Sequence, residues 1–106
     1  MKFTTSSALL SLASGAMANV WTLYCGDSCS NGTVIETGAN FTGAGCTNLT
    51  SEYDYCYLEA DKAWYYAVLY QEDDCVVSTD YPRSLISPGE CTDSGTFESY
   101  RVVVDV

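Results

Sequence analysis

Six cysteines in a chain of 106 residues constrain the fold of this protein more than any other feature. An even number of cysteines in so short a chain is typical of secreted proteins, in which disulfides compensate for a small hydrophobic core. Spacing alone does not choose among the many pairings that six cysteines allow.

The first 18 residues have the features of a secretory signal peptide. Lys2 gives a positive start, residues 8–13 form a short apolar run, and Ala16-Met17-Ala18 has the small residues that signal peptidase requires. The run is shorter than the ~20 residues of a membrane helix. We therefore expect a signal peptide over 1–18, a single mature secreted domain over 19–106, and no membrane insertion. A buried or disordered N-terminus is the alternative.

The chain is strongly acidic, with 14 Asp and Glu residues against 4 Lys and Arg residues and a net charge of −10. Loss of Lys2 with the signal peptide makes the mature chain more acidic still. This charge repels phosphate backbones and anionic lipids, so we expect no nucleic-acid partner. An extracellular protein or a cell-surface glycan is compatible with it. The charge alternatively serves solubility alone.

The two halves of the sequence align with each other, and the alignment needs one deletion. The aligned positions are Leu23-Tyr24 with Leu69-Tyr70, Asp27 with Asp73, Cys29 with Cys75, Cys46-Thr47 with Cys91-Thr92, and Tyr55 with Tyr100. The recurring spacing predicts a duplication, with repeats at about 19–60 and 64–106. Coincidence in a chain rich in Cys and Tyr is the alternative.

Local patterns within each half favour strands. Residues 20–24 and 65–70 are β-branched and aromatic runs that end in polar turns, and residues 33–37 read as a further strand. Residues 53–57 and 98–104 alternate in polarity, and residues 59–63 read as a linker. No long segment keeps a helical period. The sequence therefore predicts a mostly all-β protein.

The predicted duplication suggests a disulfide pairing. Equivalent halves would close the same bridge twice, as Cys29–Cys46 and Cys75–Cys91, which leaves Cys25–Cys56. Bridges that cross between the halves are the alternative. Such bridges would contradict the duplication, and they would also contradict the family resemblance that the next paragraph describes.

Tyr24 and Tyr70 are each followed by a cysteine five positions on, and each half ends in a predicted closing strand. This pattern resembles the double Greek-key module of the βγ-crystallin superfamily, whose hairpin signature is aromatic-x4-aromatic-x-Gly. Cys29 and Cys75 replace the second aromatic residue, and the glycine is absent. Such cysteines are similar to those of the secreted microbial branch, which includes killer-toxin-like and small cysteine-rich fungal proteins. The resemblance implies two Greek-key modules that form a small disulfide-stapled β-sandwich.

Microbial members of that family bind calcium through an Asn/Asp pair that precedes the last strand, and residues 49–54 and 94–99 lack this pair. The turn at Glu72, Asp73 and Asp74 offers carboxylates to Ca²⁺. Acidic side chains at turns are more commonly solvated, so we expect no metal and no cofactor.

Enzymatic activity is not expected. The chain has no histidine, which excludes Ser-His-Asp and Cys-His nucleophiles, and bridged cysteines supply no thiolate. A carboxylate pair for glycoside hydrolysis would need a deeper cleft than so small a domain provides. We name no catalytic residue.

Exposed aromatic and acidic side chains in the second half form the predicted binding surface. Successive residues of the run Trp64-Tyr65-Tyr66 point to opposite faces of a strand, so they cannot all be buried on one face. The candidate residues are Trp64, Tyr66, Glu72, Asp73, Asp74, Tyr81 and Arg83.

Three glycosylation sequons, at Asn31, Asn40 and Asn48, all lie in the first half. Together these features predict a secreted, non-enzymatic, toxin-like or effector-like binding protein. A structural component of a cell wall or matrix, or an inhibitor that presents residues 80–83 to a secreted enzyme, is the alternative.

Overall fold

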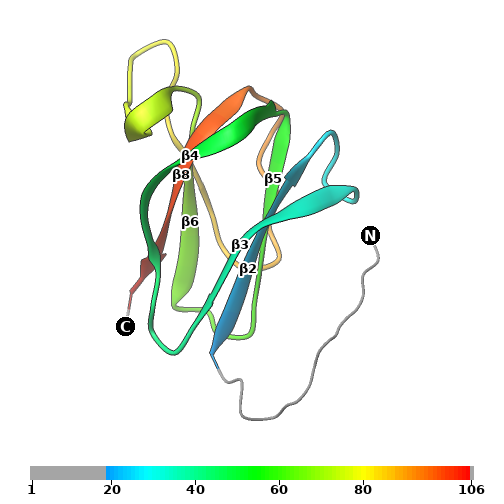
Figure 1. Cartoon of the computed structure of the whole chain (residues 1–106), viewed down its shortest axis with the longest axis vertical. Coiled ribbons are helices and arrows are strands. Elements are labelled where there is room, and N and C mark those ends of the chain that lie inside the picture. Colours follow the sequence, from blue (N-terminus) through cyan, green and yellow to red (C-terminus); the bar gives the residue numbers. More distant parts are fainter. Residues whose placement is uncertain (1–18, 106) are drawn as a thin grey trace.

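The computed structural model describes residues 19–105, so the predicted signal peptide at 1–18 lies outside the described residues. The described chain is mostly β, as predicted, and its two antiparallel sheets face each other (Figure 1). The elements are β2 (Val20–Gly26), β3 (Gly32–Ala39), β4 (Ala44–Tyr53), β5 (Tyr55–Ala60), β6 (Tyr65–Tyr70), the 3₁₀ turn η2 (Asp73–Cys75), β7 (Ser84–Ile86) and β8 (Phe97–Val104). Within residues 19–105, no helix is long and apolar enough to span a membrane.

The first sheet has the strand order β3-β2-β5 and the second has the order β4-β8-β6-β7. Alternate residues of β2 face the second sheet, so that Trp21, Leu23 and Cys25 are buried while the residue before each of them is partly exposed. They pack with Leu58, Tyr65, Leu69, Phe97 and Val102 in one hydrophobic core.

Trp21 anchors the core at one end. Its indole nitrogen donates a hydrogen bond of 2.7 Å to the carbonyl oxygen of Thr42. Its ring lies directly against Gly38, where a Cβ atom would come within 2.6 Å of the indole. Only glycine therefore fits at position 38.

The two halves of the chain contribute to the sheets in the same way. Three strands of the first half pair with one another as β3-β2-β5, and three strands of the second half pair as β7-β6-β8. The remaining segment of each half joins the other half's sheet: β4 pairs with β8, and Cys91 forms a bridge with Tyr57 of β5. The halves therefore exchange one segment each.

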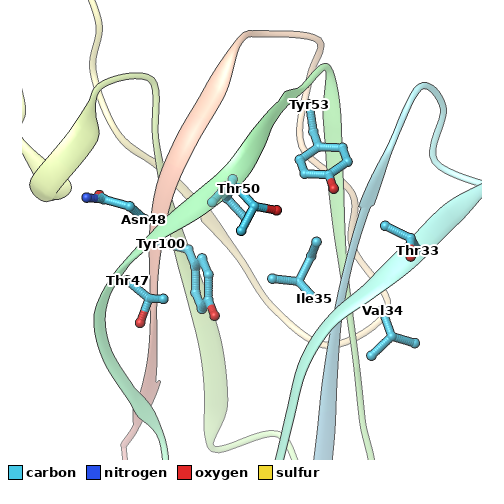
Figure 2. A pocket seen from close by; sticks show the side chains of 9 residues that line it. Thr33, Val34, Ile35, Thr47, Asn48, Thr50, Tyr53 and Tyr100 are labelled. Atoms are coloured by element: carbon cyan, nitrogen blue, oxygen red, sulfur yellow. The ribbon is translucent and has the colours of Figure 1, made fainter.

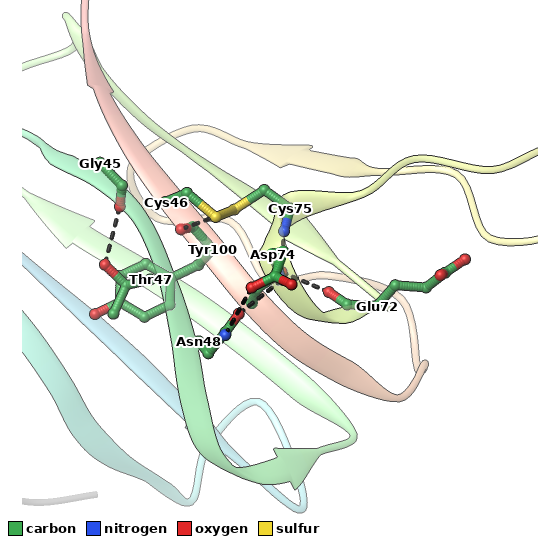
Figure 3. The surroundings of a disulfide bond; sticks show 9 residues. Gly45, Cys46, Thr47, Asn48, Glu72, Asp74, Cys75 and Tyr100 are labelled. Atoms are coloured by element: carbon green, nitrogen blue, oxygen red, sulfur yellow. Dashed lines mark hydrogen bonds between the residues drawn. A yellow bond between two sulfur atoms is a disulfide. The ribbon is translucent and has the colours of Figure 1, made fainter.

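This exchange determines the disulfides. The predicted bridge Cys25–Cys56 is confirmed, since these residues lie opposite each other on β2 and β5. The predicted bridges Cys29–Cys46 and Cys75–Cys91 are wrong: the structure has Cys29–Cys91 and Cys46–Cys75 instead. Figure 3 shows the second of these, Cys46–Cys75. Cys46 and Cys91 lie on the exchanged segments, which place each of them beside the other half's turn.

The two crossed bridges remain equivalent to each other. Each joins the turn after the first strand of one half to the exchanged segment of the other half. The three bridges use all six cysteines, which is the state typical of an oxidising compartment.

Candidate functional site

Residues 71–83, which connect β6 to β7, form an acidic loop that contains Glu72, Asp73, Asp74 and Asp80. Figure 1 shows this loop projecting from one end of the sandwich, beside the crossing of β4 and β8. Three of the predicted surface residues are among these four acids, and Tyr81 belongs to the same loop.

The acidic loop is held against β4 by a pair of hydrogen bonds between Asn48 and Asp74. The Asn48 amide nitrogen donates to a carboxylate oxygen of Asp74 at 3.0 Å, and the Asp74 backbone N–H donates to the Asn48 side-chain oxygen at 2.7 Å (Figure 3). The adjacent Cys46–Cys75 bridge fixes the same contact covalently.

Ser99 of β8 holds the base of the loop. Its hydroxyl accepts a hydrogen bond of 2.9 Å from the backbone N–H of Cys75 and donates to the carbonyl of Glu72. Asp74 and Cys75 have φ values of 62° and 56°, in the left-handed region that residues other than glycine rarely occupy. The surrounding contacts therefore hold a strained backbone at the tip of η2.

The acidic loop encloses one side of an open hollow of about 670 Å³, lined by carboxylates and apolar side chains together. The lining residues are Gln71, Glu72, Asp73, Asp74, Val76, Tyr81, Thr96 and Glu98. Val76 and Tyr81 are 47% and 51% exposed. The hollow therefore combines negative charge with apolar surface that faces solvent.

The acids around this hollow repel one another. The pKa of Glu98 is raised above its ordinary value, first by desolvation and then by a hydrogen bond with Glu52 and by the charges of Asp73, Glu52 and Glu72. A cation placed there would relieve this repulsion.

Trp64 and Tyr66 lie elsewhere, so the structure divides the predicted surface in two. They line a second hollow of about 450 Å³ together with Leu85 and Asp105. Phe41 stacks on Trp64 with ring centroids 5.2 Å apart, and the Lys62 ammonium lies 5.7 Å from the centre of the Trp64 ring.

Two residues of the predicted surface, Trp64 and Arg83, differ in their surroundings. The indole nitrogen of Trp64 is buried without a hydrogen-bond partner among the described residues. Arg83 is exposed next to β7 and is not among the residues that line either hollow.

A third hollow, of about 400 Å³, lies between β3 and β4 and was not predicted from the sequence (Figure 2). We call it the inter-sheet hollow. Its lining residues are Thr33, Val34, Ile35, Thr47, Asn48, Leu49, Thr50, Tyr53 and Tyr100. The sequence predicted a strand at 33–37 and a sequon at Asn48, but no pattern brought these two segments together.

The three sequon asparagines are all exposed, and Asn48 alone among them has a side-chain hydrogen bond with a distant part of the described chain. Residues 19–105 contain no group of three or more Cys, Asp or Glu residues arranged to hold a metal ion.

Comparisons with protein-family models, with curated proteins and with solved structures found no match to this chain.

Proposed function

We propose that this protein is a secreted, non-enzymatic binding protein that uses its acidic loop to recognise a basic surface on an extracellular protein, in a toxin-like or effector-like manner. One observation carries this proposal. A strained loop, fixed by a disulfide and by the Asn48–Asp74 pair, presents carboxylates around exposed Val76 and Tyr81.

The fixed conformation of the loop favours binding. A loop that is already ordered loses little conformational entropy when a partner docks, so more of the interaction energy appears as affinity. An aromatic side chain surrounded by charges is a common anchor of protein interfaces. The net charge of −10 would also accelerate association with a basic partner.

Bridges that cross between the halves count against the duplication and against the resemblance to the secreted βγ-crystallin-like proteins, and two of the three bridges cross in this way. The strand arrangement is the observation that still supports this relation as a proposal. Each half places its strands in one order and lends one segment to the other sheet, which agrees with two similar modules. The killer-toxin-like and effector-like role proposed here follows from that relation together with the acidic loop.

The test compares two triple variants that remove the same charge. One neutralises the loop (Glu72→Gln, Asp73→Asn, Asp80→Asn) and leaves Asp74 in its pair with Asn48. The other neutralises exposed acids that line none of the three hollows (Asp27→Asn, Asp54→Asn, Asp93→Asn). Binding of the labelled protein to intact candidate target cells is measured by flow cytometry at low and at physiological salt, after folding has been checked by circular dichroism.

We expect the loop variant to lose about tenfold in affinity, equivalent to about 1.4 kcal/mol, and to lose most of the salt dependence of binding. The control variant should bind like the unmodified protein. Equal losses in both variants would show that net charge rather than the loop drives binding. Unchanged binding of the loop variant would contradict the proposal directly.

A further inference from the structure

Two β-bulges on facing edge strands open the inter-sheet hollow. On β3, Leu23 pairs with Glu36 and Tyr24 pairs with Val34, so Ile35 has no partner residue on β2. On β4, Asn48 pairs with Ser99 and Tyr53 pairs with Phe97, so residues 49–52 lie opposite Glu98 alone. Bulges redirect side chains and are frequent beside binding sites.

Both bulged strands are at sheet edges, β3 in the first sheet and β4 in the second. The hollow therefore lies at an open side of the sandwich, where the sheets diverge. Figure 2 shows Ile35, Thr50 and Tyr53 in the gap between the two strands. Regular strands would direct fewer side chains into this gap.

The lining of the hollow is rich in hydroxyl groups and carries no charged side chain. The hydroxyls belong to Thr33, Thr47, Thr50, Tyr53 and Tyr100. Ile35 and Leu49 add apolar surface, and both pack against the core. Hydroxyl groups can donate and accept hydrogen bonds, which matches a ligand that does the same.

Tyr100 forms a rigid wall of the hollow. The residue is 3% exposed, and its hydroxyl donates a hydrogen bond of 2.6 Å to a carboxylate oxygen of Glu36. Burial and the bond to Glu36 raise the pKa of Tyr100 to about 12, so the hydroxyl keeps its proton at physiological pH. Its ring and its oxygen are therefore fixed before any ligand arrives.

We propose that the inter-sheet hollow binds a neutral saccharide, which stacks against the ring of Tyr53 and exchanges hydrogen bonds with the surrounding threonine and tyrosine hydroxyls. The volume of about 400 Å³ falls within the roughly 300–1,000 Å³ of small-molecule sites. The strongly acidic chain disfavours sulfated, phosphorylated or carboxylated sugars. The hollow and the acidic loop share Asn48, which lines the hollow and bonds to Asp74, but no residue of the loop lines the hollow, and the proposal does not depend on the proposed function.

The test is an NMR titration of the ¹⁵N-labelled protein with neutral trisaccharides of glucose, mannose and N-acetylglucosamine, and with glucuronic acid as the anionic comparison. We expect at least one neutral saccharide to shift amide resonances of residues 33–35 and 47–53 with a dissociation constant of about 1 mM. Glucuronic acid should produce no such shifts.

Two variants locate the site. Thr50→Trp fills the hollow from an exposed position of β4, and we expect it to abolish the shifts. Ser94→Trp places the same bulk at an exposed position before β8 that lines none of the three hollows, and should bind normally. The amide spectrum of each variant is first compared with that of the unmodified protein, to confirm that the variant is folded. If Thr50→Trp misfolds, Thr50→Val replaces it, because this change removes one hydroxyl and leaves the side-chain volume almost unchanged.

Three outcomes would overturn the proposal. The first is the absence of shifts with every neutral saccharide at a concentration of roughly ten times the expected dissociation constant. The second is equal binding of the Thr50 and Ser94 variants. The third is shifts at these residues with an extended peptide but not with sugars. The last result would identify the open strand edges as a site for strand addition instead.

Discussion

At the scale of single residues, Asn48 shows how a sequon and a structural contact compete for one side chain. Its amide presents both its oxygen and an N–H to Asp74 along one edge. An N-linked sugar converts this group to a secondary amide, whose remaining N–H points away from the oxygen in the trans form. A glycosylated Asn48 therefore cannot close the pair with Asp74.

We accordingly expect the secreted, folded protein to carry glycans at Asn31 and Asn40 but not at Asn48 when a eukaryotic secretory pathway produces it. Glycopeptide mass spectrometry gives the occupancy of each site. A folded protein with complete occupancy at Asn48 would refute this prediction.

The same pair predicts a difference between two substitutions that both destroy the sequon. Asn48→Ala breaks the contact with Asp74 and should lower the free energy of unfolding by about 1–2 kcal/mol. Thr50→Ala keeps the contact, removes an exposed side chain, and should change it by less than about 0.5 kcal/mol. Urea unfolding of protein made in bacteria measures both, and equal effects would show that the pair contributes little.

Glu98 predicts a pH dependence. Its raised pKa means that folding favours the protonated form. This stabilisation is complete below the ordinary glutamate pKa of 4.5 and is lost as the pH rises through the raised value. Glu98→Gln should therefore increase the melting temperature slightly at about pH 7 and not at about pH 4. Thermal unfolding at both values tests this, and an increase of the same size at both would contradict it.

At the scale of elements, the sequence revealed the strands whose residues have a strong local preference for β structure. The predicted runs 20–24, 33–37, 65–70 and 98–104 lie within or coincide with β2, β3, β6 and β8. The apolar residues of β2, β6 and β8 alternate or cluster because they pack against the core. No residue of β3 is fully buried, and its β-branched residues alone revealed it. The predicted run 53–57 instead spans the break at Asp54 between β4 and β5, and the predicted linker 59–63 overlaps the end of β5.

Two strands had no recognisable sequence pattern. Most residues of β4 are exposed, because it is an edge strand whose bulges interrupt the alternation of its side chains. The other, β7, has only three residues. The inter-sheet hollow was missed for the same reason, since bulges are set by the register between strands and not by local residue preference. The acidic loop was found because its charges are contiguous in the sequence.

The Cys46–Cys75 bridge predicts a local effect on the acidic loop. Replacing both cysteines by alanine should lower the free energy of unfolding by about 2–4 kcal/mol, since the bridge closes a long loop of chain. It should also release the strained turn at Asp74 and Cys75, so we expect faster amide hydrogen exchange in residues 71–83 than in β2 and β5. Uniformly faster exchange throughout the molecule would indicate global destabilisation without a local effect.

At the scale of the whole molecule, the exchange of segments explains both the correct and the incorrect parts of the disulfide prediction. The alignment of the two halves predicted that Cys29 and Cys75 are equivalent, as are Cys46 and Cys91. It did not show that the third segment of each half pairs with the opposite sheet, because this is a property of long-range strand pairing. The crossed bridges contradict closure within each half, yet they treat the two halves alike.

Exchange also predicts that neither half folds alone. In isolation, residues 19–62 would leave β4 without its partner β8, and residues 63–106 would leave Cys91 without Tyr57 of β5. Each half would also expose one face of the shared core, to which Trp21 and Leu58 contribute from the first half and Tyr65 and Phe97 from the second.

We therefore expect the two halves, made as separate peptides, to give circular dichroism and NMR spectra of unfolded chains, whereas the intact oxidised chain unfolds in a single transition. Oxidising an equimolar mixture of the two peptides should restore sheet structure through the two bridges that cross between them. A stable fold in either peptide alone would show that the halves are independent domains, and that the exchanged segments join structures already complete without them.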